Sequence, residues 1–192
     1  MAKAKISACV MTFNNEDLIQ DCMENVKWAN EVIVVDSYST DKTVDICRKY
    51  TDRVYQRKWP GFQDQSNYIA SLAKYEWILF TDADEIITPE LYEEIQSHLN
   101  NNSNSWDGFY FPRRTRYLGK WINHGEWYPA YDLLLYKKDK GKWVKEPHAT
   151  LELNGRAKHL KNDCLHYTYR DLSHQLETID KYTDMSAVEM DK

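Results

Sequence analysis

Two spacings of apolar residues alternate along the first hundred residues of the chain. Short, almost continuous apolar runs are typical of strands buried on both faces, whereas apolar residues at every third or fourth position are typical of amphipathic helices. The predicted strands are residues 6–11, 31–36, 53–56 and 77–81, and the helices that follow them begin near residues 16, 41, 62 and 89. Four strand–helix repeats predict an α/β fold with a mostly parallel sheet and helices on both faces.

Polar residues stand at the expected starts of three of these helices. We expect Asn14 or Asn15 to cap the first helix, and Thr40 with Asp41 to cap the second. Thr88 precedes a proline, and a capping residue followed by proline at the first helical position favours a helix start there.

The second half of the chain is less regular. A polar, Asn-rich loop is predicted at residues 100–105, and strands are predicted at residues 108–112, 133–136, 150–153 and 164–167. A final amphipathic helix is predicted from the spacing of Leu172, Leu176, Ile179, Tyr182 and Met185. We expect residues 1–192 to form one domain. The chain ends inside the final helical pattern, so we also expect the native protein to be longer.

Polar side chains follow each of the four predicted parallel strands. They are Thr12 and Asn14, then Asp36, then Arg57, and finally Asp82 and Asp84. The carboxyl ends of parallel strands meet at one edge of the sheet, where the ligands of such sheets bind. These six residues are therefore the first candidates for a binding site.

Composition narrows the class of protein. The 192 residues are 42% apolar and carry a formal charge of −5, which fits a folded domain and argues against a dedicated nucleic-acid binder. The four cysteines form no C-x-x-C pair and lie in apolar stretches of sequence. We therefore expect them to be small buried apolar residues of a protein in the reducing cytosol. No stretch approaches the roughly 18 apolar residues of a membrane span, and no signal peptide is evident. We therefore expect a cytoplasmic protein.

Asp82 and Asp84 form a D-x-D pair directly after an apolar strand. In extended backbone, side chains two residues apart point to one side, roughly 7 Å apart. Two carboxylates so placed can share one hard divalent cation, whose natural partner is a diphosphate. The alternative is that these residues only form a turn and bind no ligand, because D-x-D is common by chance and Asp is frequent in turns.

An enzyme of another class would use the same residues. In haloacid-dehalogenase phosphatases an apolar strand also leads into D-x-D, and Asp82 would then be the nucleophile. That group prefers its motif near the N-terminus, and Ile86 occupies a position where it has Thr or Val. A dinucleotide-dependent oxidoreductase is disfavoured because no G-x-G-x-x-G follows any predicted strand.

Several segments together resemble the inverting family 2 glycosyltransferases of GT-A fold, which is Rossmann-like with a mostly parallel central sheet. The segments are TFN (12–14), VVDSYSTD (34–41), WPGF (59–62) with Gln65 and Asn67, and DADE (82–85). Later segments resemble the bacterial branch that contains the lipopolysaccharide-core β-1,4-glucosyltransferases. These are GKWI (119–122), His124, WYP (127–129) and HYTYRD (166–171).

The resemblance implies transfer of a sugar, such as glucose, from a UDP-sugar to a cell-envelope glycan or glycolipid such as lipopolysaccharide core. Residues 1–105 would bind the donor and residues 106–192 would form the acceptor side. Asp36 would accept a hydrogen bond from the nucleotide base, and Asp82 would contact the ribose. Asp84 would hold Mg²⁺ or Mn²⁺, with Asp82 as the second metal residue. The remaining expected donor-binding residues are Thr12, Asn14, Arg57, Gln65 and Ala83.

The chain departs from this branch where the catalytic base is expected. Ala130 and Ala149 stand at positions where the branch has an acid, and Asn15 and Tyr38 replace the usual Glu and Gly. Asp132 lies two positions after Ala130 and can face the same side of an extended segment. We therefore predict Asp132 as the general base, with Glu126 as the second candidate. A non-catalytic carbohydrate-binding module remains an alternative, because the usual acids are missing.

Two further features bear on the acceptor side. His148 and His166 are candidates for contact with the metal or the diphosphate. Residues 113–145 hold nine Lys and Arg against three Asp and Glu, a local charge of +6, and seven Trp and Tyr. Half of these aromatic residues are expected in the core. The others are expected to stack on acceptor sugars, while the cations meet acceptor phosphates or the cytoplasmic face of the inner membrane.

Overall fold

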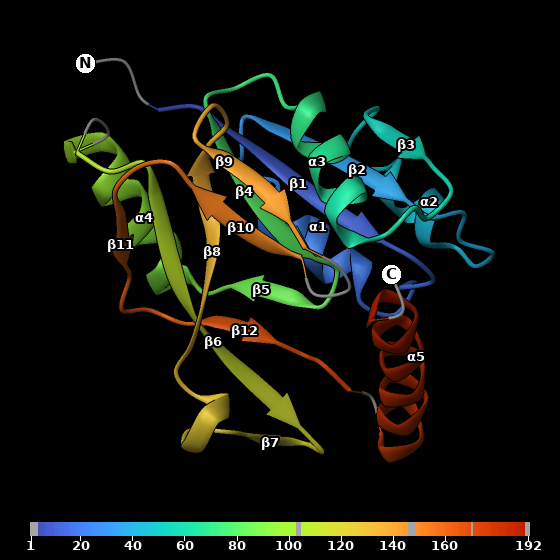
Figure 1. Cartoon of the computed structure of the whole chain (residues 1–192). Coiled ribbons are helices and arrows are strands. Elements are labelled where there is room, and N and C mark those ends of the chain that lie inside the picture. The colour runs from blue at the N-terminus through green and yellow to red at the C-terminus, as the bar shows by residue number, and fades with distance from the viewer. Residues whose placement is uncertain (1–3, 103–104, 146–148, 170, 191–192) are drawn as a thin grey trace.

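The computed structural model describes residues 4–102, 105–145, 149–169 and 171–190. Figure 1 shows a central sheet flanked by helices, with the last helix standing beside it. No helix among the described residues has the length and apolar character needed to cross a bilayer.

The first half forms the predicted parallel sheet. Its strands are β1 (Ile6–Thr12), β2 (Glu31–Asp36), β3 (Val54–Gln56) and β4 (Trp77–Asp82), in the spatial order β3-β2-β1-β4. The helices are α1 (Ile19–Val26), α2 (Thr43–Cys47), α3 (Phe62–Leu72) and α4 (Pro89–Asn102). All three strand pairs are parallel, so the carboxyl ends of β1, β2 and β4 lie at one edge as predicted.

The second half continues the same sheet with mixed strand directions. Beyond β4 the order is β8 (Ala130–Lys137), β6 (Gly108–Tyr117), β12 (Cys164–His166) and β5 (Glu85–Ile87). β4 and β8 are antiparallel, as are β8 and β6, whereas β6 and β12 are parallel. Because β8 and then β6 follow β4 across the sheet, the second half of the chain lies directly beside β4.

Short elements complete the fold. β7 (Lys120–Trp121) and β11 (Ala157–His159) pair with β6, and β9 (Gly141–Val144) pairs with β10 (Thr150–Leu153). A 3₁₀ turn, η1 (Gly125–Trp127), precedes β8, and α5 (Leu172–Met190) ends the described chain. β5, β7, β9 and β11 were not predicted.

Two predicted helix caps were wrong. α1 begins after Leu18, and it is the main-chain carbonyl of Asn15 that accepts from the amides of Leu18 and Ile19. The side chain of Asn14 binds the next loop instead of the helix. α2 begins after Lys42, although Asp41 Oδ1 does accept from the amide of Thr43 at 3.0 Å.

The two ends of α4 were predicted with different success. Thr88 Oγ1 accepts from the amide of Leu91 at 3.2 Å, which confirms the predicted cap. α4 runs through Asn102, so the first part of the predicted loop at residues 100–105 is helical.

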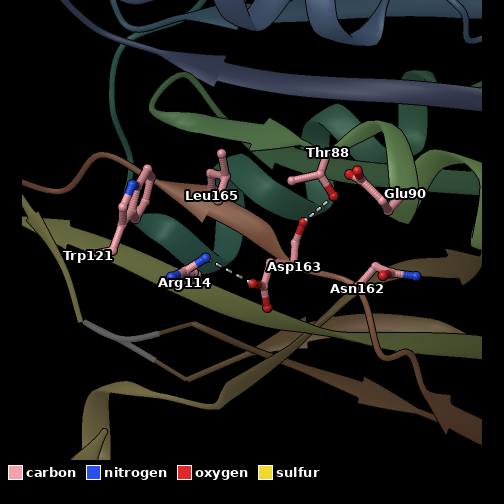
Figure 2. Close-up of a pocket in the computed structure, with 7 residues that line it drawn as sticks. All are labelled: Thr88, Glu90, Arg114, Trp121, Asn162, Asp163 and Leu165. Atoms are coloured by element: carbon pink, nitrogen blue, oxygen red, sulfur yellow. Dashed lines mark hydrogen bonds and ion pairs between the residues drawn. The ribbon is translucent and has the colours of Figure 1, made fainter. Parts of the chain in front are cut away.

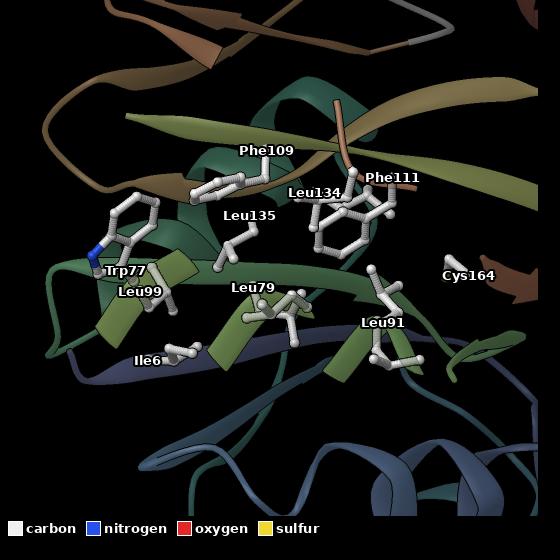
Figure 3. Packing of buried hydrophobic residues seen from close by; sticks show 13 residues of the cluster. Ile6, Trp77, Leu79, Leu91, Leu99, Phe109, Phe111, Leu134, Leu135 and Cys164 are labelled. Atoms are coloured by element: carbon white, nitrogen blue, oxygen red, sulfur yellow. The ribbon is translucent and has the colours of Figure 1, made fainter. Parts of the chain in front are cut away.

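A shared hydrophobic cluster joins the two halves. Trp77 and Leu79 of β4 pack with Phe109 of β6, Leu135 of β8 and Leu91 of α4, as Figure 3 shows. Each of these side chains is at most 1% exposed. Burial on this scale stabilises the fold by roughly 1.5–3 kcal/mol per large side chain. The cluster fixes β6 and β8 against β4 and thereby sets which polar residues meet at the end of β4.

Buried aromatic residues and cysteines follow the sequence-based expectation. Tyr136 and Trp143, from the aromatic-rich stretch, lie in a second cluster of the core, and the Trp143 indole donates to the Tyr136 hydroxyl at 3.1 Å. The four cysteines are free thiols in the core. The aromatic stretch is thus divided between the core and the surface.

Candidate functional site

The loops after β1 and β2 hold each other in place at the edge of the sheet. Asn14 and Tyr38 both adopt left-handed backbone, with φ of 50° and 63°. Asn14 Oδ1 accepts a hydrogen bond from the main-chain amide of Thr40 at 2.8 Å. The main-chain amide of Asn14 donates to Ser39 Oγ, also at 2.8 Å. Thr12 Oγ1 donates to Asn15 Oδ1 at 3.1 Å. Thr12 and Asn14 therefore lie where they were predicted, and the side chain of Asn14 organises the edge.

Asp36 is fully buried at the end of β2. Its Oδ2 accepts from the amide of Ser39 at 2.9 Å and from Gln56 Nε2 at 3.0 Å, and the Ser39 hydroxyl donates to Oδ1. A buried carboxylate needs such partners, because an unpaired one is costly. The carboxylate is thus fixed at the edge formed by β1 and β2.

Arg57 and Gln65 join this edge from β3 and α3. The Arg57 amide donates to the carbonyl of Asp36 at 2.9 Å, and Arg57 Nη1 donates to Gln65 Oε1 at 3.2 Å. The Arg57 guanidinium also lies over the Tyr68 ring, 4.5 Å from its centroid. Gln65 is fully buried, and its Nε2 donates to Ser37 Oγ at 3.4 Å. The predicted residues Asp36, Arg57 and Gln65 therefore form one connected group.

Three carboxylates gather where β4 turns into β5. Asp82 ends β4, Asp84 lies in the turn, and Glu85 begins β5. The amide of Asp82 donates to Glu85 Oε2 at 3.1 Å. Burial, followed by the negative charges of Glu85 and Asp84, raises the pKa of Asp82 well above its usual value. The D-x-D pair thus lies within a cluster of three carboxylates, and such a concentration of negative charge favours a bound cation.

Arg113 connects this acidic turn to Asp132. Its Nε lies 2.9 Å from Glu85 Oε1 and its Nη1 lies 2.8 Å from Asp132 Oδ2. Glu85 is buried, whereas the Asp132 side chain is 44% exposed. Burial opposes the charged guanidinium, but the carboxylates of Glu85 and Asp132 raise the pKa of Arg113 above its usual value. Asp132 is therefore an accessible carboxylate held beside the acidic turn.

The other candidates divide between the site and the surface. His166 Nε2 lies 3.4 Å from Asp84 Oδ2, and His166 Nδ1 lies 3.5 Å from Thr115 Oγ1, so this histidine does reach the acidic turn. His148 is outside the described residues. Glu126 is exposed in η1, and no contact links it to Asp82 or Asp84. Ala83 is buried between the two aspartates and packs in the core.

The donor set around Asp82 and Asp84 suits a hard divalent cation. Carboxylate oxygens are the ligands that Mg²⁺ and Mn²⁺ prefer. Among the described residues, no three His, Cys, Asp or Glu side chains converge as a complete metal site. The two carboxylates would suit a cation whose remaining ligands come from a diphosphate and from water. Such a cation would favour the ionised form of Asp82, whose pKa is raised by burial and then by the charges of Glu85 and Asp84.

Sequence reasoning missed two residues of this region besides Glu85. Arg113 was counted only among the cations of residues 113–145, because its pairing with Glu85 and Asp132 depends on strand neighbours that only the fold supplies. Tyr182 of α5 was assigned to an apolar helix face. Its ring stacks on Phe62 with centroids 5.9 Å apart, and burial, followed by the charges of Asp82 and Asp84, raises its pKa. The last helix therefore contributes to the same edge of the molecule.

Comparison with protein families and curated proteins shows the family of the chain. Residues 7–152 match the family Glycosyl transferase family 2. A glycosyltransferase of Rickettsia bellii is 43% identical over 93 residues, which cover 48% of this chain and 32% of that protein. The lipopolysaccharide core biosynthesis glycosyltransferase LpsC of Rhizobium meliloti is 24% identical over 193 residues, covering 96% of this chain and 71% of that protein. The matched part thus spans about a third of the first of these relatives.

Solved structures share the fold. S. aureus TarS 1–349 in complex with UDP-GlcNAc superposes with a TM-score of 0.62 at 18% identity, over 89% of this chain and 60% of that chain. The mannosyltransferase PcManGT of Pyrobaculum calidifontis, in complex with GDP-Man and Mn²⁺, gives a TM-score of 0.65 at 17% identity, over 91% and 60%. The fold is therefore the GT-A type that the sequence predicted. With the family match over residues 7–152, the chain belongs to glycosyl transferase family 2.

Proposed function

We propose that the protein transfers a sugar, a hexose such as glucose, from a UDP-sugar to a hydroxyl of a cell-envelope glycan, with inversion at the anomeric carbon. The observation that carries this proposal is the placement of Asp132. Arg113 holds this exposed carboxylate beside the Asp82–Asp84 turn, so a base for the acceptor lies next to a site for the donor diphosphate. The similarity to LpsC, a lipopolysaccharide core biosynthesis glycosyltransferase, and to TarS, whose structure holds UDP-GlcNAc, supports the acceptor and donor classes.

The donor would lie along the edge formed by β1, β2 and β4. The Asp36 carboxylate would accept a hydrogen bond from the nucleobase, and the Asp82 carboxylate would accept one from a ribose hydroxyl. Asn14 would act through the shape of its loop, because its side-chain oxygen already accepts from Thr40. Arg57 and Gln65 would border the donor and keep the end of β3 against α3.

Asp84, with Asp82 beside it, would hold Mg²⁺ or Mn²⁺. When bound, the cation would neutralise the diphosphate as the sugar leaves it. His166, close to Asp84, would orient this carboxylate from the acceptor side.

Asp132 would accept the proton of the acceptor hydroxyl as that hydroxyl attacks the anomeric carbon. Arg113 would hold the carboxylate beside the acidic turn. Asp132 is preferred over Glu126 because contacts join it to the turn, whereas Glu126 is exposed in η1.

The direct test is a thermal-shift screen of nucleotide sugars with and without Mn²⁺, followed by a transfer assay. We expect UDP-sugars to raise the melting temperature only when Mn²⁺ is present. A UDP-independent complex of beryllium fluoride at Asp82 would instead support the phosphatase alternative. Binding of glycans without any nucleotide effect would support the carbohydrate-binding module.

We also propose that the basic residues of the stretch 113–145 bring the protein to the cytoplasmic face of the inner membrane, where a glycolipid acceptor would lie. Attraction between basic residues and anionic lipids weakens as salt is added. Sedimentation with vesicles that contain anionic lipid should therefore show binding that falls between low and high salt. Equal binding to neutral vesicles would contradict this proposal.

A further inference from the structure

A cavity of about 360 Å³ lies on the face of β6 and β12 that points away from Asp84. In the register of these strands Arg114 pairs with Leu165, and Thr115 pairs with His166. Successive residues of a strand point to opposite faces. Because His166 contacts Asp84, Arg114 and Leu165 must face the other side. The cavity is therefore separate from the acidic turn.

The lining combines apolar surface with hydrogen-bonding groups, as Figure 2 shows. Trp121 and Leu165 supply the apolar walls, and the Tyr167 ring packs edge-on against Trp121 with centroids 5.5 Å apart. Arg114 and Asn162 supply N–H donors, while Glu90 and Asp163 supply carboxylate acceptors. The lining is therefore mostly polar with one aromatic wall, which suits a ligand that carries many hydroxyls on an apolar ring.

Two of the polar groups are held in position by residues behind them. Asp163 Oδ1 accepts from the Tyr128 hydroxyl at 2.9 Å, and Arg114 Nε donates to Asn123 Oδ1 at 2.8 Å. Asp163 Oδ2 and Arg114 Nη1 are 3.9 Å apart, which is beyond hydrogen-bond distance. An oriented acceptor and an oriented donor thus stand side by side, as two neighbouring hydroxyls of one ring require.

The charges of the lining favour a neutral ligand. Glu90 and Asp163 outweigh Arg114, so the cavity carries a formal charge of −1, which disfavours phosphate or a carboxylate. A sugar ring offers an apolar face for Trp121 and hydroxyls for Asp163, Arg114 and Asn162. The volume is near the lower end of small-molecule sites, roughly 300–1,000 Å³, and suits one or two sugar units.

We propose that this cavity is a second saccharide site, which binds a neutral sugar unit of the acceptor glycan at a distance from the hydroxyl that reacts. Its assignment to the acceptor rests on the proposed function. The binding of a saccharide there does not, because the cavity lies across β12 and β6 from the acidic turn.

The test is a titration of the full chain with the neutral disaccharides cellobiose, lactose and maltose, without nucleotide or metal, followed by NMR of the tryptophan indole N–H signals. We expect saturable binding of at least one disaccharide, with a shift of the Trp121 signal. Trp121→Ala should weaken this binding at least tenfold, and Glu90→Ala, an exposed substitution, should weaken it severalfold. Trp106→Ala is the matched control, because Trp106 lies outside both the lining and the stretch 113–145, and it should leave binding within twofold.

The Asp84→Asn variant separates this proposal from the proposed function. It should lose nucleotide-dependent stabilisation and keep disaccharide binding. Binding that survives both Trp121→Ala and Glu90→Ala would overturn the proposal, as would binding that is lost in Asp84→Asn. Absence of binding up to on the order of 10 mM disaccharide, or displacement of the disaccharide from the cavity by inorganic phosphate, would overturn it equally.

Discussion

Arg113 Nη1 lies 2.8 Å from Asp132 Oδ2, across the antiparallel pair of β6 and β8. The same guanidinium ion-pairs through Nε with Glu85, which is 2% exposed at its side chain. One cation therefore pairs with a buried carboxylate of the acidic turn and with an accessible carboxylate of β8. A substitution of Arg113 should therefore affect both Glu85 and Asp132.

Arg113→Gln should destabilise the protein by about 3 kcal/mol, because Glu85 would remain buried without its cation. Urea unfolding followed by circular dichroism measures this loss. Adding Glu85→Gln to Arg113→Gln removes the unpaired charge, so the double variant should be more stable than Arg113→Gln alone. If the two losses simply add, the ion pair does not have the stabilising role described here.

Asp132→Asn should lower the rate of sugar transfer by about 10²–10⁴-fold, since the amide cannot accept the acceptor's proton. Donor affinity should stay close to that of the unaltered protein, as measured by UDP titration with Mn²⁺. Glu126→Gln is the matched variant on η1 and should retain most of the rate. The reverse ranking would make Glu126 the base.

Asp84→Asn should abolish the rise in melting temperature that UDP and Mn²⁺ produce together. A ligand at about 100 times its Kd stabilises a protein by about 2.7 kcal/mol, and this gain is lost when the ligand no longer binds. Asp139→Asn, an exposed acid outside the site, serves as the control. A full response of Asp84→Asn to UDP with Mn²⁺ would show that the cation is held elsewhere.

The native protein should react very slowly with thiol reagents at pH 8. Burial raises the pKa of Cys47 to about 12 and raises the pKa values of Cys9, Cys22 and Cys164 as well, so the reactive thiolate is scarce. Four thiols should become reactive together when urea unfolds the chain. Rapid labelling of one cysteine in the native protein would contradict its burial.

The sequence by itself determined the first half of the molecule. Uninterrupted apolar runs at β1, β2 and β4 indicated strands covered on both faces, and polar residues after each run indicated one ligand-binding edge. The position of Asp36, Asp82 and Asp84 at this edge could be predicted because Asp36 and Asp82 end the strands that carry them, and Asp84 lies in the turn after β4. Local patterns are sufficient when a residue and its supporting element are neighbours in the chain.

Only the tertiary structure decided which residues of the second half join that edge. The spacing from Ala130 favoured Asp132 over Glu126 but gave neither a partner, and the pairing of β6 with β8 placed Asp132 against Arg113. Glu85 and Tyr182 were also unpredictable as partners, since Glu85 meets Arg113 from β6, and Tyr182 arrives from the far end of the chain. Such contacts depend on strand order and helix docking. The hydrophobic cluster of β4, β6, β8 and α4 fixes that order, and no local pattern encodes it.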